Sequence, residues 1–211
     1  MGAPSDAAGD HYFSEAPASR SRPGTVRLAI GDEVVELATD RGTFSPGRID
    51  PGTAFLLDRA PTPPSSGRFL DLGCGYGPIA VTLARRSPGA DIVAVDVNER
   101  SRSLTAENAG RLGLDNVSVC APDDVDGERF DVIWSNPPIR IGKDALHQLL
   151  LRWLVRLSPD GAAVLVVNRH LGADSLQRWL TAQGIPTERL ASRKGYRLLR
   201  ASAPGGVDGQ S

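Results

Sequence analysis

The chain has 211 residues, of which 40% are hydrophobic and 23% are charged, and this suits one globular domain with short extensions. Its formal net charge of -1 excludes a polycation that binds nucleic acid with its whole surface, so such binding would need a local basic patch. Cys74 and Cys120 have neither pairing nor metal-ligand spacing, which argues against a disulfide scaffold and a structural metal site. The N-terminus lacks a signal-peptide pattern, and no apolar run approaches membrane-spanning length. We therefore expect a cytoplasmic protein without a metal.

The N-terminal part is predicted to contain a flexible segment and a small extension. Residues 1–24 are rich in small and turn-forming residues and are expected to be mostly flexible. TVRLAI and EVVELA (25–38) alternate around a Gly-Asp turn, which predicts a β-hairpin. Asp50 followed by Pro51 is typical of a helix start, with a capping carboxylate and a proline at the first helical position. The hairpin and this helix make up an expected unit over residues 25–60.

From residue 61 to 201, predicted strands alternate with predicted helices. The strands are 68–71, 91–97, 116–120, 130–135 and 162–167, and the helices are 78–87, 98–113, 145–158 and 173–184. Two further strands, 187–192 and 195–202, follow without a helix between them and predict an antiparallel edge. The expected fold is α/β, a Rossmann-like, seven-stranded, mostly parallel sheet with helices on both faces, an antiparallel C-terminal strand and the N-terminal hairpin. The tail, 202–211, is expected to be disordered.

A glycine-rich loop, DLGCGYGP (71–78), lies between the first of these strands and its helix. Its three glycines occupy alternate positions, Gly73, Gly75 and Gly77. Glycines allow a tight turn and a close approach to a ligand, and Asp96 at the end of the next strand can accept hydrogen bonds from ribose hydroxyls. The spacing differs from the G-x-G-x-x-G of dinucleotide sites, and Asp71 would repel a pyrophosphate but can bind an amino group. We therefore expect S-adenosylmethionine, which has a ribose and an amine but no phosphate.

Asp123 follows the third predicted strand of the sheet. At this position its side chain either reaches the amino group of the adenine or belongs to a solvated turn, because Asp is common in turns. The residue pattern leaves both readings open.

The segment SNPPI (135–139) ends the fourth predicted strand of the sheet, since two prolines cannot continue a ladder. It would place Asn136 near the glycine loop, where open α/β sheets bind ligands. The Asn136 side-chain oxygen and the Pro137 carbonyl can accept hydrogen bonds from an exocyclic amine, whose lone pair is otherwise delocalised into its ring. No strong base is needed before attack, so we assign no role to the three histidines. The segment predicts methyl transfer to an amine.

Together these motifs resemble the "methyltransferase small" family of class I S-adenosylmethionine-dependent methyltransferases, over roughly residues 11 to 200. The resemblance is carried by HYFS (11–14), TDRGTFSPGRID (39–50), LDLGCGYGPIA (70–80), VDVNER (95–100), FDVIWSNPPIRIGK (130–143) and KGYRLL (194–199). The best-known members are ribosomal RNA guanine-N2 methyltransferases, and this chain is similar to the short, single-domain branch. The resemblance implies ribosomal RNA as partner and guanine N2 as target.

The resemblance also implies roles for individual residues. The methionine end of the cofactor would be held by Asp71, Gly73, Gly75 and Gly77, the ribose by Asp96 with Val97 beside it, and the adenine by Asp123, with Phe44 and Ser45 completing the pocket. The target base would be held by Asn136, Pro137, Pro138 and Ile139. Arg140 and Lys143 either contact RNA phosphates or form a solvated turn.

Several alternatives stay open. Many amine methyltransferases have an aromatic residue after Asn-Pro-Pro that stacks on the base, and Ile139 cannot stack. A protein glutamine N-methyltransferase would need similar acceptors, and a non-catalytic module that binds S-adenosylmethionine or RNA, or a small-molecule methyltransferase, are further possibilities. A homodimer could build a composite basic surface, since the chain has no room for a second domain.

Overall fold

The computed structural model describes residues 22–40, 48–127, 129–138 and 141–205. The HYFS motif and four residues with expected roles, Phe44, Ser45, Ile139 and Arg140, lie outside these ranges. No helix in the described ranges is both long and apolar enough to cross a bilayer.

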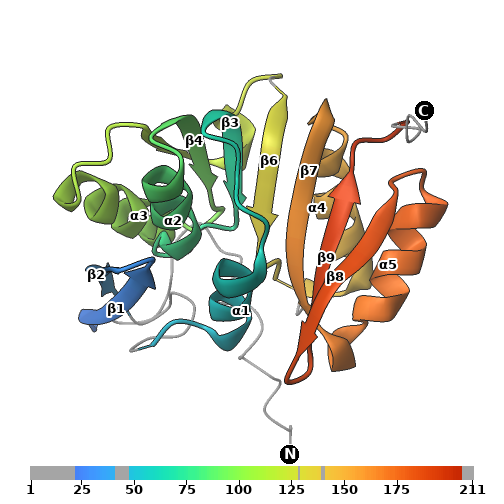
Figure 1. The fold of residues 1–211 in the computed structure, drawn as a ribbon, viewed down its shortest axis with the longest axis horizontal. Helices are drawn as coiled ribbons and strands as arrows, with labels where there is room; N and C mark the ends of the chain where they lie inside the picture. The colour runs from blue at the N-terminus through green and yellow to red at the C-terminus, as the bar shows by residue number, and fades with distance from the viewer. Residues whose placement is uncertain (1–21, 41–47, 128, 139–140, 206–211) are drawn as a thin grey trace, which may run out of the picture.

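A seven-stranded sheet forms the centre of the molecule, with the strand order β5-β4-β3-β6-β7-β9-β8 (Figure 1). Its strands are β3 (Ser66–Leu72), β4 (Gly89–Val95), β5 (Val117–Cys120), β6 (Phe130–Ser135), β7 (Leu157–Asn168), β8 (Thr187–Arg193) and β9 (Tyr196–Ser202). All neighbouring pairs are parallel except the two that involve β9. This arrangement confirms the Rossmann-like, mostly parallel sheet.

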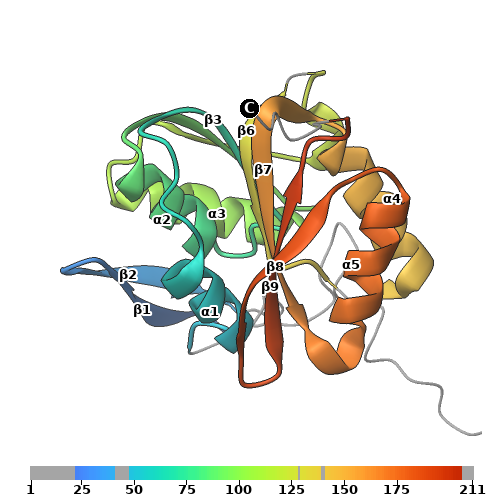
Figure 2. The same cartoon turned by 45° about the vertical axis from the view of Figure 1, so that its right-hand side comes forward.

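Helices cover both faces of this sheet, as Figure 2 shows. They are α1 (Pro51–Arg59), α2 (Pro78–Arg86), α3 (Glu99–Arg111), α4 (Lys143–Leu154) and α5 (Ala173–Ala182), with short 3₁₀ turns η1 (Pro122–Asp124) and η3 (Arg169–Leu171). Alternate strand residues point to opposite faces, so Phe69 packs in the layer with α1, α2 and α3, and Leu70 packs in the layer with α4 and α5. The near-continuous apolar strands follow from this double burial.

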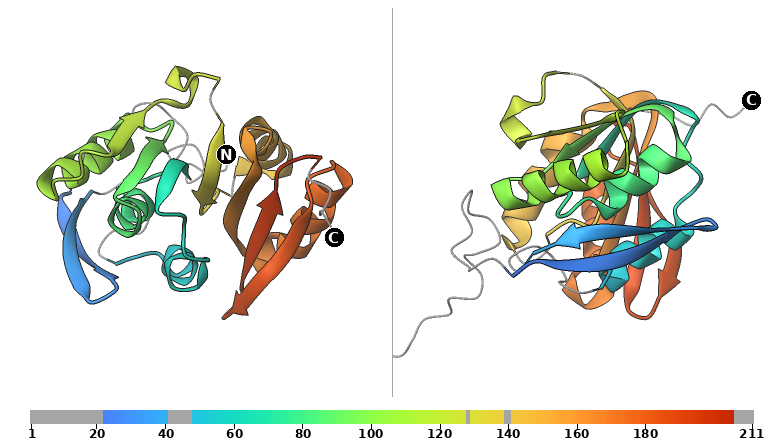
Figure 3. Two further views of the ribbon diagram at one scale, coloured as in Figure 1. Left: turned by 45° about the horizontal axis from the view of Figure 1, so that its top comes forward. Right: turned by 90° about the vertical axis from the view of Figure 1, so that its left-hand side faces the viewer.

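The predicted hairpin is present as β1 (Gly24–Ile30) and β2 (Glu33–Thr39), a separate antiparallel sheet. It lies beside α3, as the two views of Figure 3 show. Asn108 of α3 pairs with β2 as a neighbouring strand would: its amide nitrogen donates to the Ala38 carbonyl at 2.9 Å, and its amide oxygen accepts from the Ala38 N–H at 2.7 Å. The division of the chain at residue 61 stays a prediction, although α1 packs against β7 and β9 of the central sheet.

One element prediction was inaccurate in detail. The helix expected to reach residue 158 ends at Leu154, because Leu157 already pairs with Phe130 and begins β7. The predicted antiparallel edge is confirmed: β9 and β8 end the sheet, and β9 lies between β7 and β8.

The register of β3 positions the functional motifs. Leu72, its last residue, pairs with Val95 of β4 on one side and Ser135 of β6 on the other. The glycine loop therefore lies between Asp96 and Asn136, at the point where the strand order reverses. Ligands of open α/β sheets bind at such a point.

Candidate active site at the carboxyl edge of the sheet

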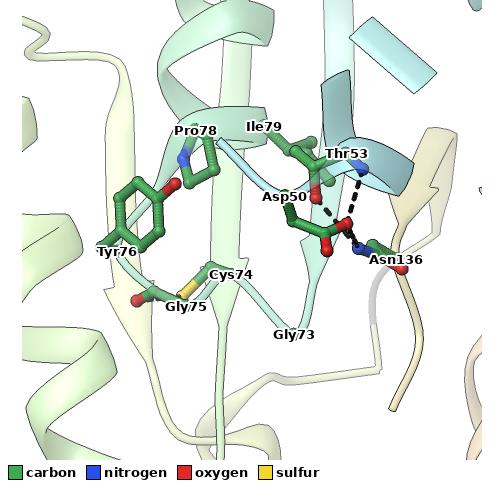
Figure 4. A pocket seen from close by; sticks show the side chains of 9 residues that line it. All are labelled: Asp50, Thr53, Gly73, Cys74, Gly75, Tyr76, Pro78, Ile79 and Asn136. Atoms are coloured by element: carbon green, nitrogen blue, oxygen red, sulfur yellow. Dashed lines mark hydrogen bonds between the residues drawn. The ribbon is translucent and has the colours of Figure 1, made fainter. Parts of the chain in front are cut away.

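Two cavities lie at this edge, and both are lined by Gly73 and Asn136. The smaller is also lined by Asp50, Thr53, Cys74, Gly75, Tyr76, Pro78 and Ile79 (Figure 4). The larger is also lined by Leu72, Val95, Asp96, Val97, Pro122, Pro138, Ile141, Ala145 and Leu149. An elongated ligand with a polar end and an apolar, ring-bearing end could occupy both cavities and pass Asn136 at their junction.

The three glycines of the loop serve two different purposes. All three have positive φ, of +79° at Gly73, +59° at Gly75 and +94° at Gly77, a conformation that favours glycine. A Cβ at Gly73 or Gly75 would meet no protein atom within 4 Å and would project into open space. A Cβ at Gly77 would lie 3.1 Å from the Thr105 side chain of α3. The first two glycines thus leave room for a ligand, and the third permits helix packing.

Asp96 joins the glycine loop to the end of β4. Its two carboxylate oxygens accept hydrogen bonds from the Gly75 N–H at 3.0 Å and the Asn98 N–H at 2.9 Å. Each oxygen keeps a free lone pair, and the side chain lines the larger cavity. Burial raises the pKa of Asp96 above its ordinary value, although the two N–H donors oppose the shift. The carboxylate is well placed to accept hydrogen bonds from ribose hydroxyls.

Asp71 lies beneath the glycine loop and is fully buried. One oxygen accepts from the Ala80 N–H at 2.9 Å, and the other has no hydrogen-bond partner among the described residues. Burial, with a further contribution from the charge of Asp96, raises the pKa of Asp71 to about 8. An ammonium group bound above it would supply the missing donor and favour the ionised form. Because Asp71 lines neither cavity, its contact with the methionine end stays a prediction.

Asn136 is half-buried and directly follows β6. Its amide nitrogen donates to Asp50 Oδ1 at 2.8 Å and to Thr53 Oγ1 at 3.0 Å (Figure 4). Among the described residues, no donor contacts the carbonyl of Pro137, whereas the carbonyl of Pro138 accepts from the Ile141 N–H at 3.2 Å. The amide oxygen of Asn136 remains as an acceptor beside the cavities. Pro137 is buried and lines neither cavity, so the contact of its carbonyl with an amine stays a prediction.

Asp123 and Lys143 lie at the rim. The Asp123 side chain is 88% exposed and accepts from Arg152 at 2.7 Å, while the preceding Pro122 lines the cavity. This geometry favours the reading of Asp123 as a solvated turn residue, and its adenine contact stays a prediction. Lys143 is exposed at the start of α4, near Ala145 of the cavity wall.

The motifs did not reveal several residues of the site. They are Asp50, Thr53 and Tyr76 in the smaller cavity and Pro122, Ile141, Ala145 and Leu149 in the larger one. Asp50 was predicted only as a helix cap, a role it performs by accepting from the Gly52 and Thr53 N–H groups. Tyr76 is buried, and burial with the nearby charge of Asp50 raises its pKa. No spacing rule connects these residues, because the fold brings them together from separate segments.

Comparisons with known proteins agree with this geometry. The model of the methyltransferase small domain family matches residues 34–200. YbxB of Bacillus subtilis is 33% identical over 196 residues, which cover 91% of this chain and 98% of that protein. Ribosomal RNA small subunit methyltransferase C of Stutzerimonas stutzeri is 34% identical over 201 residues, which cover 89% of this chain and 58% of that protein. The chain thus spans little more than half the length of the latter relative.

Two solved structures share the fold. The 16S rRNA N2 G1207 methyltransferase of T. thermophilus, in complex with AdoMet and guanosine, superposes with a TM-score of 0.71 and 24% identity, covering 89% of this chain and 52% of that one. A ribosomal protein L11 methylase of Lactobacillus delbrueckii superposes with a TM-score of 0.60 and 20% identity, covering 84% of this chain and 98% of that one. The family match confirms the resemblance drawn from the motifs and, with it, the S-adenosylmethionine cofactor. The chain belongs to the methyltransferase small domain family of S-adenosylmethionine-dependent methyltransferases.

Proposed function

We propose that the protein methylates an exocyclic base amine in ribosomal RNA and that guanine N2 is the target. The proposal is supported by relatives that bear the name ribosomal RNA small subunit methyltransferase C. It is carried by one observation: Asn136 lines both cavities, so its free acceptor lies where they meet.

The residues of the site fit the cofactor. The Asp96 carboxylate would accept hydrogen bonds from the ribose hydroxyls, and the apolar side chains of Val97, Ile141 and Leu149 would enclose the adenine. The open space above Gly73 and Gly75 would admit the methionine end. When bound, S-adenosylmethionine supplies a methyl group on a sulfonium, which is an electrophile that needs no metal activation.

The acceptors at Asn136 and Pro137 suit an aromatic amine. Such an amine is a weak nucleophile because its lone pair is delocalised into the ring. Two acceptors that bind its N–H groups favour a tetrahedral nitrogen and direct the lone pair away from the ring plane. A buried Pro137 and a strand immediately before Asn136 keep these acceptors rigid before substrate binds.

Exposed cations surround this edge of the sheet. Lys143 begins α4, Arg169 follows β7, and Lys194 lies in the β8–β9 turn, which is joined to η3 by a hydrogen bond from the Arg169 N–H to the Gly195 carbonyl at 2.6 Å. Within the described part of the chain, no carboxylate forms an ion pair with these three side chains, whereas Arg193 pairs with Asp58 at 2.8 Å. Three free cations beside the acceptor site suit the phosphates of a structured RNA despite the near-neutral net charge.

The test is methyl transfer from radiolabelled S-adenosylmethionine to undermodified small and large ribosomal subunits, naked ribosomal RNA, transfer RNA and total protein. We expect label in ribosomal RNA and a loss of at least about 100-fold in Asn136→Ala, since it removes one transition-state acceptor. Retained cofactor binding by this variant is the control for folding. Label confined to protein would contradict the proposal and support the glutamine methyltransferase alternative.

A further inference from the structure

We propose that Asp50, with Thr53 as a second anchor, is a positioning residue that determines which atom of the Asn136 amide faces the reacting amine. This inference rests on the proposed use of Asn136 as an acceptor and assigns the residues that make it one. Asp50 caps α1 and Thr53 lies in its first turn, 86 and 83 residues before Asn136 in the chain.

The first step of the argument is the chemistry of the two ends of an amide. The amide of Asn136 has a donor end and an acceptor end of nearly the same shape, so rotation by 180° exchanges them. Only one orientation offers an acceptor to an amine substrate. The other orientation would present an NH₂ group to another N–H donor, which is repulsive. Catalysis therefore requires something that distinguishes the two ends.

Asp50 makes this distinction because an ionised carboxylate accepts hydrogen bonds and cannot donate them. Its Oδ1 lies 2.8 Å from the Asn136 amide nitrogen. In the reversed orientation, two oxygens would face each other at about this distance with no proton between them. The Thr53 hydroxyl, 3.0 Å away, can donate or accept, so it holds the amide in place without selecting an orientation. Asp50 is the discriminating partner.

The discriminating carboxylate is itself immobilised. Asp50 Oδ1 also accepts from the N–H groups of Gly52 at 2.8 Å and Thr53 at 3.0 Å, and the residue is only 8% exposed. The first turn of α1 is fixed against β9, since a Cβ at Gly52 would lie 2.9 Å from the Tyr196 ring. The helix cap and the orientation of the amide thus use the same oxygen atom.

Asp50→Ser separates these two uses. Ser caps a helix about as well as Asp, so α1 should keep its stability. Its hydroxyl, however, can either donate to Asn136 or accept from it, so the preference for one orientation is lost. At saturating cofactor and acceptor we expect kcat to fall by about 10- to 100-fold, as for other small misplacements of catalytic groups. Unchanged kcat, or an effect confined to the KM for S-adenosylmethionine, would overturn the proposal.

Thr53 offers a matched pair of variants. Thr53→Ser keeps the hydroxyl and should retain kcat within about two-fold, whereas Thr53→Val removes one hydrogen bond and should lower kcat by about 3- to 10-fold. Equal losses in both variants would mean that the methyl group of Thr53 matters rather than its hydroxyl, and would remove Thr53 from the proposal.

The reciprocal exchange is a sharper test. Asn136→Asp alone places two carboxylates together and should be nearly inactive. In the double variant Asp50→Ser/Asn136→Asp, the hydroxyl introduced at position 50 can donate to one oxygen of the carboxylate introduced at position 136, and the other oxygen still faces the cavity. We expect the double variant to exceed the activity of Asn136→Asp by at least about 10-fold, a non-additivity typical of residues in direct contact. Additive losses would contradict a direct coupling.

A measurement without any acceptor distinguishes this inference from the proposed substrate. The Asn136 side-chain amide signals can be assigned in ¹H–¹⁵N spectra by their loss in Asn136→Asp. We expect one sharp, exchange-protected NH₂ pair in the wild-type protein and a doubled or broadened pair in Asp50→Ser. Identical signals in both proteins would overturn the inference. If the wild-type protein showed this pattern but methylated no RNA, the substrate proposal would fail and the amide orientation would stand.

Discussion

At the scale of single residues, Asp71 has the most unusual environment in the site. It is fully buried, one of its oxygens has no partner among the described residues, and its pKa is raised to about 8. The folded protein therefore binds a proton at Asp71 more tightly than the unfolded chain does. This contribution to stability is complete below about pH 4 and is lost as the pH rises towards 8.

Asp71→Asn should remove this pH dependence. We expect the cofactor-free variant to be more stable than the wild-type protein at pH 8 by a few kcal/mol, or roughly 5 to 10 °C in Tm, with a much smaller difference at pH 5. The variant should also bind S-adenosylmethionine more weakly, because it cannot pair with an ammonium group. Thermal unfolding from pH 5 to pH 8.5 measures the effect, and parallel Tm curves for the two proteins would contradict it.

The sequence identified those site residues that belong to local motifs. Asp96 and Asn136 each follow a strand, and a strand end can be read from hydrophobicity and turn residues. The link between Asp50 and Asn136 could not be read in this way, because it depends on how α1 packs against β7 and β9. Asp123 shows that a suitable position in the sequence does not determine what a side chain contacts. Its position fits an adenine contact, but its carboxylate pairs with Arg152.

At the scale of elements, Asn108 connects the N-terminal hairpin to the cofactor loop. Besides its two bonds to Ala38, its amide nitrogen donates to the Tyr76 carbonyl at 2.8 Å. Asn108→Ala would leave these backbone groups without partners and should destabilise the protein by about 2 to 4 kcal/mol. Hydrogen exchange at β2 should accelerate. The exposed neighbour Glu107→Ala is the control and should change stability by less than about 0.5 kcal/mol; equal effects would contradict this role of Asn108.

The glycine loop and α3 are matched in shape. Gly77→Ala combines a positive φ with a contact of 3.1 Å to buried Thr105, whereas Gly113→Ala has a positive φ and open space around it. We expect a loss of about 1 kcal/mol for Gly113→Ala and at least about 2 kcal/mol for Gly77→Ala. Denaturant unfolding of both variants compares them, and equal losses would show that packing against Thr105 has no cost.

Element boundaries were less predictable than element types. Helical periodicity continues through residue 158, but Leu157 pairs with Phe130 in the parallel sheet. The helix therefore ends before Leu157. Gly161 then passes so close to β6 that a Cβ would lie 2.7 Å from the Phe130 carbonyl. Likewise, β8 and β9 follow each other in sequence and are expected to be antiparallel neighbours. Their order in the sheet depends on which of the two pairs with β7, and this is β9.

At the scale of the whole molecule, α1 and α4 complete a site that the central sheet alone would leave open. The sheet supplies Asp96 and Asn136, α1 supplies Asp50 and Thr53, and α4 encloses the larger cavity. Three exposed cations, Lys143, Arg169 and Lys194, lie at the same edge. The proposed RNA substrate would be recognised by a few residues around this edge.

The chemical identity of the methylated nucleoside tests the central claim most directly. Ribosomal RNA labelled by the enzyme would be digested to nucleosides and analysed by chromatography with mass spectrometry. We expect the label in N2-methylguanosine, absent after reaction with Asn136→Ala. Label in a ring-carbon or ribose-methylated nucleoside, or undiminished label with Asn136→Ala, would contradict a mechanism in which Asn136 accepts hydrogen bonds from an exocyclic amine.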